Sequence, residues 1–144
     1  FKTYDEFAKT PFDQLFQFKT DPQIATEFAN GILMWENDQL VFKPFPNFGQ
    51  MGCINKFITL DLNGDEFLDF IAFGNKYEAE IETPRYDANP GLAFINKGGK
   101  GDFDIYPLEQ NGPYMNRNAK DAVMIGNKIF VSNSGESVDV LEVY

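Results

Sequence analysis

The chain has 144 residues, 43% of them hydrophobic, which is enough apolar material for one domain with a core and excludes a disordered chain. Its net charge is −10, and such a surface repels phosphate groups, so we expect no binding to nucleic acid. The chain has no histidine, which excludes Ser-His-Asp and Cys-His catalytic sites, and its single cysteine excludes an intramolecular disulfide.

Residues 1–27 are predicted to form a short helical segment. Thr3 and Glu6 have the spacing of a capping box, with Thr3 as the N-cap, and Thr10-Pro11 has the form of a second helix start. The apolar residues after this start recur at helical spacing and are expected to face a core: Phe12, Leu15 and Phe16.

From residue 28 onward, short apolar runs alternate with tight turns, a pattern that predicts β-hairpins. The 16 phenylalanines and 6 tyrosines also favour strands. Trp35, near the end of the first run, is expected in the core. The expected hairpins are 31–35 with 39–45, 57–62 with 67–73, 91–96 with 102–107 and 121–125 with 128–132, followed by a last strand at 137–144.

The chain also repeats itself, because residues 33–45 and 93–108 share one pattern: an apolar strand, a polar turn, an aromatic residue and an exit with proline. The offset is about 60 residues, in the size range of repeats built from four strands. We therefore predict a mainly β fold, with about two four-stranded antiparallel β-propeller-type blades after the helical segment. The first unit spans 28–75, a long polar loop spans 76–90 and the second unit spans 91–144.

The most informative motif is the loop 61–69, between two apolar runs. Oxygen-bearing side chains occupy its positions 1, 3, 5 and 9: Asp61, Asn63, Asp65 and Asp69. Calcium takes about six to eight oxygen ligands, so this alternation suits Ca²⁺. An EF-hand is excluded because Glu66 and Ala72 stand where it needs glycine and a bidentate glutamate. A solvated acidic turn without a metal is the alternative.

The loop Asp61-x-Asn63-Gly64-Asp65-x-x-x-Asp69 resembles the calcium-binding loop of FG-GAP repeats, which occur in integrin α-chain propellers and in bacterial VCBS-type proteins. The segment 82–92 is similar to the C-terminal part of bacterial VCBS proteins that carry an ASPIC/UnbV-type region. The resemblance implies a β-propeller that holds Ca²⁺ between adjacent strands. By position, the ligands would be the side chains of Asp61, Asn63, Asp65 and Asp69 and the backbone carbonyl of Phe67.

Two features depart from that family. The chain has length for about two blades, whereas the family commonly has seven, so the remainder of a larger propeller or a homo-oligomer is expected to complete it. The chain also begins at Phe1 and not at Met, as expected of a processed chain or a fragment. In the second unit, Gly126-Asn127 stands where an acidic loop is expected, so that unit is expected to bind no metal.

The resemblance implies a non-catalytic calcium-binding segment for recognition or scaffolding, extracellular, at the cell surface or in the periplasm, with a protein or a glycan as partner. No apolar run approaches the ~20 residues that span a membrane, so no membrane insertion is expected. Two alternatives stay open. One is a carbohydrate-active hydrolase that uses acids of the loop 78–87, namely Glu78, Glu80, Glu82 and Asp87. The other is a metal-free structural repeat.

Overall fold

The computed structural model describes residues 2–15, 23–110 and 114–144, and every statement below is limited to them. The helical elements are α1 (Tyr4–Lys9), α2 (Phe12–Leu15) and two short 3-10 helices, η1 (Asn47–Gln50) and η2 (Leu108–Gln110). The strands are β1 (Gly31–Glu36), β2 (Gln39–Pro44), β3 (Ile54–Leu60), β4 (Asp69–Gly74), β5 (Leu92–Asn96), β6 (Phe103–Pro107), β7 (Ala119–Ile125), β8 (Lys128–Asn133) and β9 (Asp139–Glu142).

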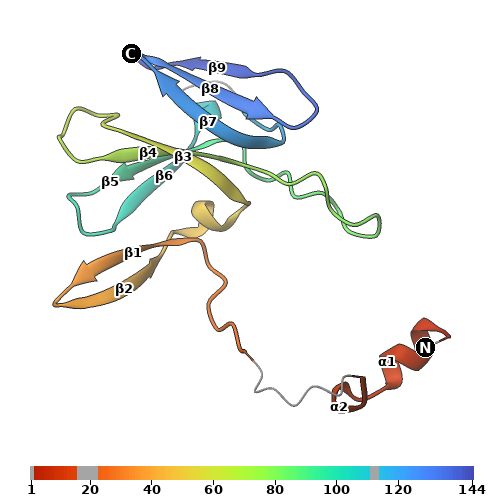
Figure 1. Ribbon diagram of the computed structural model, residues 1–144. Helices are drawn as coiled ribbons and strands as arrows, with labels where there is room; N and C mark the ends of the chain where they lie inside the picture. The colour runs from red at the N-terminus through yellow and green to blue at the C-terminus, as the bar shows by residue number, and fades with distance from the viewer. Residues whose placement is uncertain (1, 16–22, 111–113) are drawn as a thin grey trace.

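The described strands form three antiparallel sheets that stack as layers (Figure 1): β1-β2, then β3-β4-β5-β6, then β7-β8-β9. The mainly β, antiparallel fold is thus confirmed, and the predicted hairpins are all present. In the first hairpin, Asn37 and Asp38 both have positive φ angles, the conformation of a two-residue hairpin turn.

The prediction of two four-stranded units is wrong, because only one of the sheets formed by the described residues has four strands. That sheet takes strands from both sides of the loop 76–90. The cause is a pair of buried asparagines at the two ends of the loop. The side-chain amide of Asn75 donates to the carbonyl of Asn89 at 2.9 Å, and the Asn89 backbone N–H donates back to Asn75 Oδ1 at 2.9 Å. These bonds hold the loop ends together, so β4 and β5 pair.

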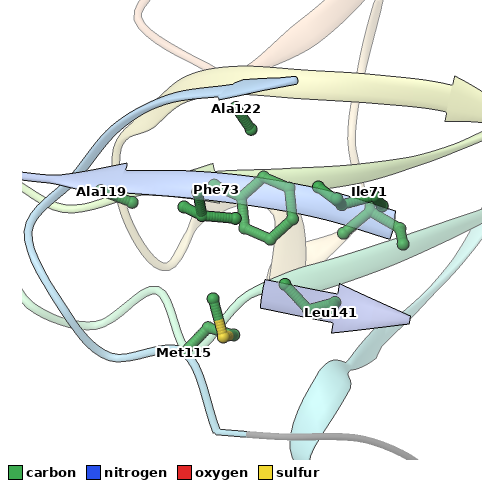
Figure 2. Close-up of a cluster of buried hydrophobic side chains, with 8 residues drawn as sticks. Ile71, Phe73, Met115, Ala119, Ala122 and Leu141 are labelled. Atoms are coloured by element: carbon green, nitrogen blue, oxygen red, sulfur yellow. The ribbon is translucent and has the colours of Figure 1, made fainter. Parts of the chain in front are cut away.

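Side chains alternate across β4, so the four-stranded sheet has a core on each face. Ile71 and Phe73 face the β7-β8-β9 sheet, where Figure 2 shows them beside Met115 and Leu141. Ala119 and Ala122 of β7 belong to the same cluster. The third sheet and the segment before it therefore cover Ile71 and Phe73 on this face.

The opposite face of the four-stranded sheet carries a cluster of phenylalanines. The rings of Phe70 and Phe94 stack at 4.2 Å between centroids, and Phe103 meets Phe70 edge-on at 5.2 Å. Phe45, which follows β2, packs its ring 4.8 Å from that of Phe94. Phe45 thereby attaches the β1-β2 hairpin to this face of the sheet, over β4, β5 and β6.

The N-terminal prediction is confirmed only in part. Thr3 is the N-cap of α1 and accepts the Glu6 N–H at 3.2 Å, but residues 23–28 are not helical. The prediction that the helical aromatics face a core is wrong for Phe12, which is 75% exposed, since neither helix buries a residue. Phe16 lies outside the described residues.

Trp35 also differs from its prediction, because it lies on the exposed face of β1 with 69% of its surface accessible. Among the described residues, no helix is long and apolar enough to cross a membrane.

Candidate functional site

The loop between β3 and β4, with the first residue of β4, contains all five residues that the sequence singles out. The backbone turns sharply there, because Gly64 and Glu66 have φ angles of 78° and 69°. A Cβ on Gly64 would meet no atom within 4 Å, so the φ angle and not crowding requires the glycine. The turn leaves Asp61, Asn63 and Asp65 exposed at the end of the sheet.

Asp61 organises the first half of the loop through its carboxylate. Oδ2 accepts the Glu66 N–H at 3.0 Å, and Oδ1 accepts the Gly64 N–H at 2.8 Å and the Asp65 N–H at 3.3 Å. These backbone donors, Glu66 foremost, lower the pKa of Asp61 below its ordinary value. Asp61 is therefore ionised at neutral pH, which is the state that a cation binds.

Asn63 and Asp65 form the second half of the loop. The Asn63 side-chain amide donates to Asp65 Oδ2 at 2.9 Å, and Asn63 Oδ1 accepts the Asp65 N–H at 3.1 Å. Asp65 Oδ1 accepts the Phe67 N–H at 2.9 Å. The side chains at loop positions 1, 3 and 5 thus converge on the loop's own backbone.

Asp69 differs from the other acids because it is fully buried at the start of β4. Its Oδ2 accepts the Leu62 N–H at 2.8 Å, and its Oδ1 accepts the Asn96 N–H at 2.8 Å. Asn96 in turn donates its side-chain amide to the Leu68 carbonyl at 3.1 Å. Asp69 therefore fastens the loop to the end of β5.

A second contact joins the loop to the β5-β6 turn, where the ring of Phe67 lies against Gly99. The Gly99 N–H also donates to the Asn96 side-chain oxygen at 2.7 Å. Asn96 is the residue of this site that the sequence analysis missed. Nothing near it in the chain marks it, because its role depends on the pairing of β4 with β5.

The loop 61–69 offers oxygen donors to a cation. Its donor set, three carboxylates and an amide oxygen, is of the kind that calcium prefers. Among the described residues, however, no three acidic or cysteine residues are grouped closely enough to hold a metal ion. The carboxylates of Asp61 and Asp65 are turned to backbone amides in this conformation. Binding would require those carboxylates to exchange amide donors for the ion.

The acids of the long loop have other roles. Glu78 forms an ion pair with Lys120 at 2.8 Å and accepts the Asn118 side-chain amide at 2.9 Å, and these bonds, that to Lys120 foremost, lower its pKa to about 2. The general acid of a glycosidase needs a raised pKa, so Glu78 does not suit that role. Asp87 pairs with Arg85 at 2.8 Å.

The rest of this loop projects from the sheets. A bridge between Lys76 and Tyr86 closes its base, and the Arg85 guanidinium lies 4.5 Å from the Tyr77 ring centroid. Glu80 and Glu82 flank the tip, where Ile81 is fully exposed. The described geometry therefore places these two glutamates on an exposed projection and not in a cleft.

In the third sheet, β7 and β8 are joined directly by Gly126 and Asn127, the turn that the sequence places where an acidic loop would otherwise stand.

Comparisons of the chain with models of protein families, with curated proteins and with solved structures find no match. The resemblance of the loop 61–69 to FG-GAP repeats therefore depends on its own residues.

Proposed function

We propose that this chain is a non-catalytic, calcium-binding segment built from β-propeller-type repeats, which serves recognition or scaffolding outside the cytoplasm. The observation that carries the proposal is the loop 61–69, in which Asn63, Asp65 and the ionised Asp61 share one exposed turn. Buried Asp69 fastens this turn to the sheet. The ion would be held by the side chains of these four residues and by the backbone carbonyl of Phe67.

The stacking of the sheets supports a propeller-type arrangement. A four-stranded antiparallel sheet lies between two smaller antiparallel sheets, with apolar clusters on both of its faces. Blades of a propeller are four-stranded sheets packed face to face in this manner. In that interpretation β3 to β6 form one blade, and the smaller sheets are parts of its neighbours, which a larger propeller or a second copy completes.

The location of the loop explains what an ion would do for this fold. Asp69 and Phe67 connect the loop to Asn96 and Gly99 at the β5-β6 turn. A cation that ordered the loop would therefore stiffen the whole end of the blade. The bound ion would supply only charge neutralisation and a fixed set of bonds, and no chemical step.

The exposure of the ligands suggests the compartment. Exposed loops in extracellular modules bind calcium with dissociation constants of about 0.1–1 mM, near the concentration outside cells. The loop here is exposed at Asp61, Asn63 and Asp65, which fits weak binding of this kind. Partners at such a surface would be proteins or glycans. Magnesium suits the loop less well because it demands tight octahedral geometry.

The first prediction concerns thermal stability with and without calcium. If the dissociation constant is about 1 mM, then about 10 mM CaCl₂ stabilises the folded state by about 1.4 kcal/mol. For a chain of this size, that corresponds to a rise of about 3–6 °C in melting temperature over the value in EDTA. Asp65→Ala should remove the rise. Differential scanning calorimetry measures both, and isothermal titration gives the affinity directly.

Glu109→Ala is the matched control, because it removes an exposed carboxylate outside the loop and should keep the full rise. Each variant is compared with itself in EDTA, so a change in baseline stability caused by losing the hydrogen bond that Asp65 accepts from the Phe67 N–H does not affect the result. No rise at millimolar calcium, or an equal rise in Asp65→Ala, would contradict the proposal and leave a metal-free structural repeat.

A further inference from the structure

We propose that an apolar groove beside β1 binds an extended segment of a partner protein, which adds to the free edge of β1 as a third strand and carries basic residues at its N-terminal end. Strand addition to β1 does not require bound calcium, whereas the preference for basic residues uses Asp61 and Asp65, which the proposed function also assigns to the ion.

The groove has a volume of about 500 Å³ and lies between β1 and the phenylalanine face of the four-stranded sheet. Gly31 and Leu33 of β1 form one wall, and Phe57 and Phe70 form the floor. Leu68, which belongs to the loop 61–69, lines one end of the groove. Leu33, Phe57 and Leu68 are 60%, 56% and 64% exposed, so three large apolar side chains of one groove face solvent.

This groove continues an apolar interface that already exists within the chain. On the same face of the four-stranded sheet, Phe94 and Phe103 are 0% and 6% exposed, because the β1-β2 hairpin and Phe45 cover them. The cover ends at β1, and Phe57 of β3 is left open. Neighbouring strands lie about 4.8 Å apart, so a strand added to β1 extends the same packing over Phe57.

The edge of β1 is also built differently from the other sheet edges. Proteins protect free edges with charges, proline or short strands. β2 has Lys43 and Pro44, β3 has Lys56, β6 has Asp104 and Pro107, β7 has Lys120 and Asp121, and β9 has only four residues, Asp139 and Glu142 among them. In β1 the first five residues, Gly31 to Trp35, have neither charge nor proline, and in the described part of the chain β1 pairs only with β2. Such an edge suits strand addition.

Charge favours a basic partner and sets its direction. Met34 lies beside Gly101 of the β5-β6 turn, which also meets the loop 61–69, so the C-terminal end of β1 points to that acidic loop. Three of its four carboxylates, Asp61, Asp65 and Glu66, are exposed. Lys43 and Lys97 at this end already pair with Glu36 and Asp104, so the acids outnumber the remaining Lys100. A strand antiparallel to β1 begins at this end, so its N-terminal residues meet the carboxylates.

The test uses a synthetic peptide, Lys-Lys-Val-Thr-Val-Thr-Val-Thr, titrated into the whole chain in EDTA. Trp35 is the only tryptophan and lies on β1, so its fluorescence reports binding directly. We expect a saturable blue shift of the emission. Two control peptides should bind at least tenfold more weakly: one with proline at the central valine, which loses a backbone donor, and one with the lysines moved to the C-terminal end.

Two protein variants locate the site. Leu33→Lys places a charge on the groove wall and should weaken peptide binding at least tenfold. Leu40→Lys is its match on β2, since Leu40 is also 60% exposed but does not line the groove, and should bind within twofold of the wild type. Phe57→Thr changes the floor in a different sheet and should also weaken binding, whereas Val123→Thr on β7 should not.

Several outcomes would overturn the proposal. No binding at 1 mM peptide, or equal binding of the proline peptide, would rule out strand addition as the binding mode. Equal binding of the peptide with its lysines at the C-terminal end would rule out a partner with basic residues at its N-terminal end. If analytical sedimentation showed a dimer, and the Leu33→Lys substitution dissociated it, the occupant would be a second copy of this chain. If only a variant that lacks residues 1–27 bound peptide, the occupant would be the chain's own N-terminal segment.

Discussion

Glu78 is a single exposed carboxylate that attaches a long loop to a neighbouring sheet. Its carboxylate accepts hydrogen bonds from the Lys120 ammonium and from the side-chain amide of Asn118, and Asn118 is buried beside β7. Its pKa is lowered from 4.5 to about 2, chiefly by the bond from Lys120. The ionised form is therefore favoured by folding, and the two bonds supply stability that is present above the ordinary pKa.

The second prediction follows from the sign of that shift. The stabilising effect of Glu78 should be complete above pH about 4.5 and should fade as pH falls through about 2. The difference in urea midpoint between the wild type and Glu78→Gln should accordingly be constant from pH 7 to 5 and shrink toward pH 2. Glu80→Gln, which removes a neighbouring exposed carboxylate, is the control. A difference that stays constant down to pH 2 would show that the ion pair does not stabilise the fold.

The residues of the candidate site divide into those that the sequence reveals and those that it does not. Asp61, Asn63 and Asp65 lie within a few residues of one another, so their spacing alone predicts that they share a turn. Asp69 also belongs to the predicted set, but its burial and its bond to Asn96 depend on strand pairing that the loop sequence does not encode.

Among the elements, the junction between β4 and β5 depends most on a few side chains. Asn75 is fully buried, has a φ angle of 90°, and binds Asn89 with both ends of its side-chain amide. It also donates to the Arg117 carbonyl at 3.1 Å. One asparagine thereby joins the long loop, the four-stranded sheet and the approach to β7.

The third prediction is that Asn75→Ala lowers the free energy of unfolding by about 3 kcal/mol. Buried groups left without a partner cost about 1–3 kcal/mol, and a left-handed backbone adds about 1–2 kcal/mol for alanine. Asn75→Gly loses the same bonds without the backbone strain, so it should be about 1 kcal/mol more stable than Asn75→Ala. Urea unfolding measures all three proteins. Equal stability of the two variants would show that the φ angle imposes no cost.

The elements themselves were readable from sequence, but their grouping was not. Hairpins are local, and their turns carry strong signals such as Asn37-Asp38 and Gly126-Asn127. The pairing of β4 with β5 crosses the loop 76–90 and is closed by Asn75 and Asn89, which no short pattern marks. The repeat of about 60 residues in the sequence therefore suggested the wrong grouping of strands into sheets.

For the whole molecule, the stability lies in the two apolar clusters on either side of the four-stranded sheet. Both clusters are built from residues after β1 begins. The segment before it contributes no buried residue among those described, because α1 and α2 bury none and residues 23–28 are exposed. In Figure 1 the helices lie away from the three sheets. The core should therefore fold without them.

The fourth prediction is that deleting residues 1–27 changes the melting temperature by no more than about 1 °C, because the deletion exposes no part of either cluster. Deleting residues 137–144 is the contrasting change, since it removes Leu141 and with it one side of the cluster around Ile71 and Phe73. Loss of a buried leucine alone costs about 2–5 kcal/mol, so this second truncation should lower the melting temperature by at least about 5 °C. Scanning calorimetry of the two truncations beside the full chain decides the matter. A large loss of stability on removing residues 1–27 would show that the N-terminal segment packs on the sheets in solution, and the groove beside β1 would be its nearest apolar docking site.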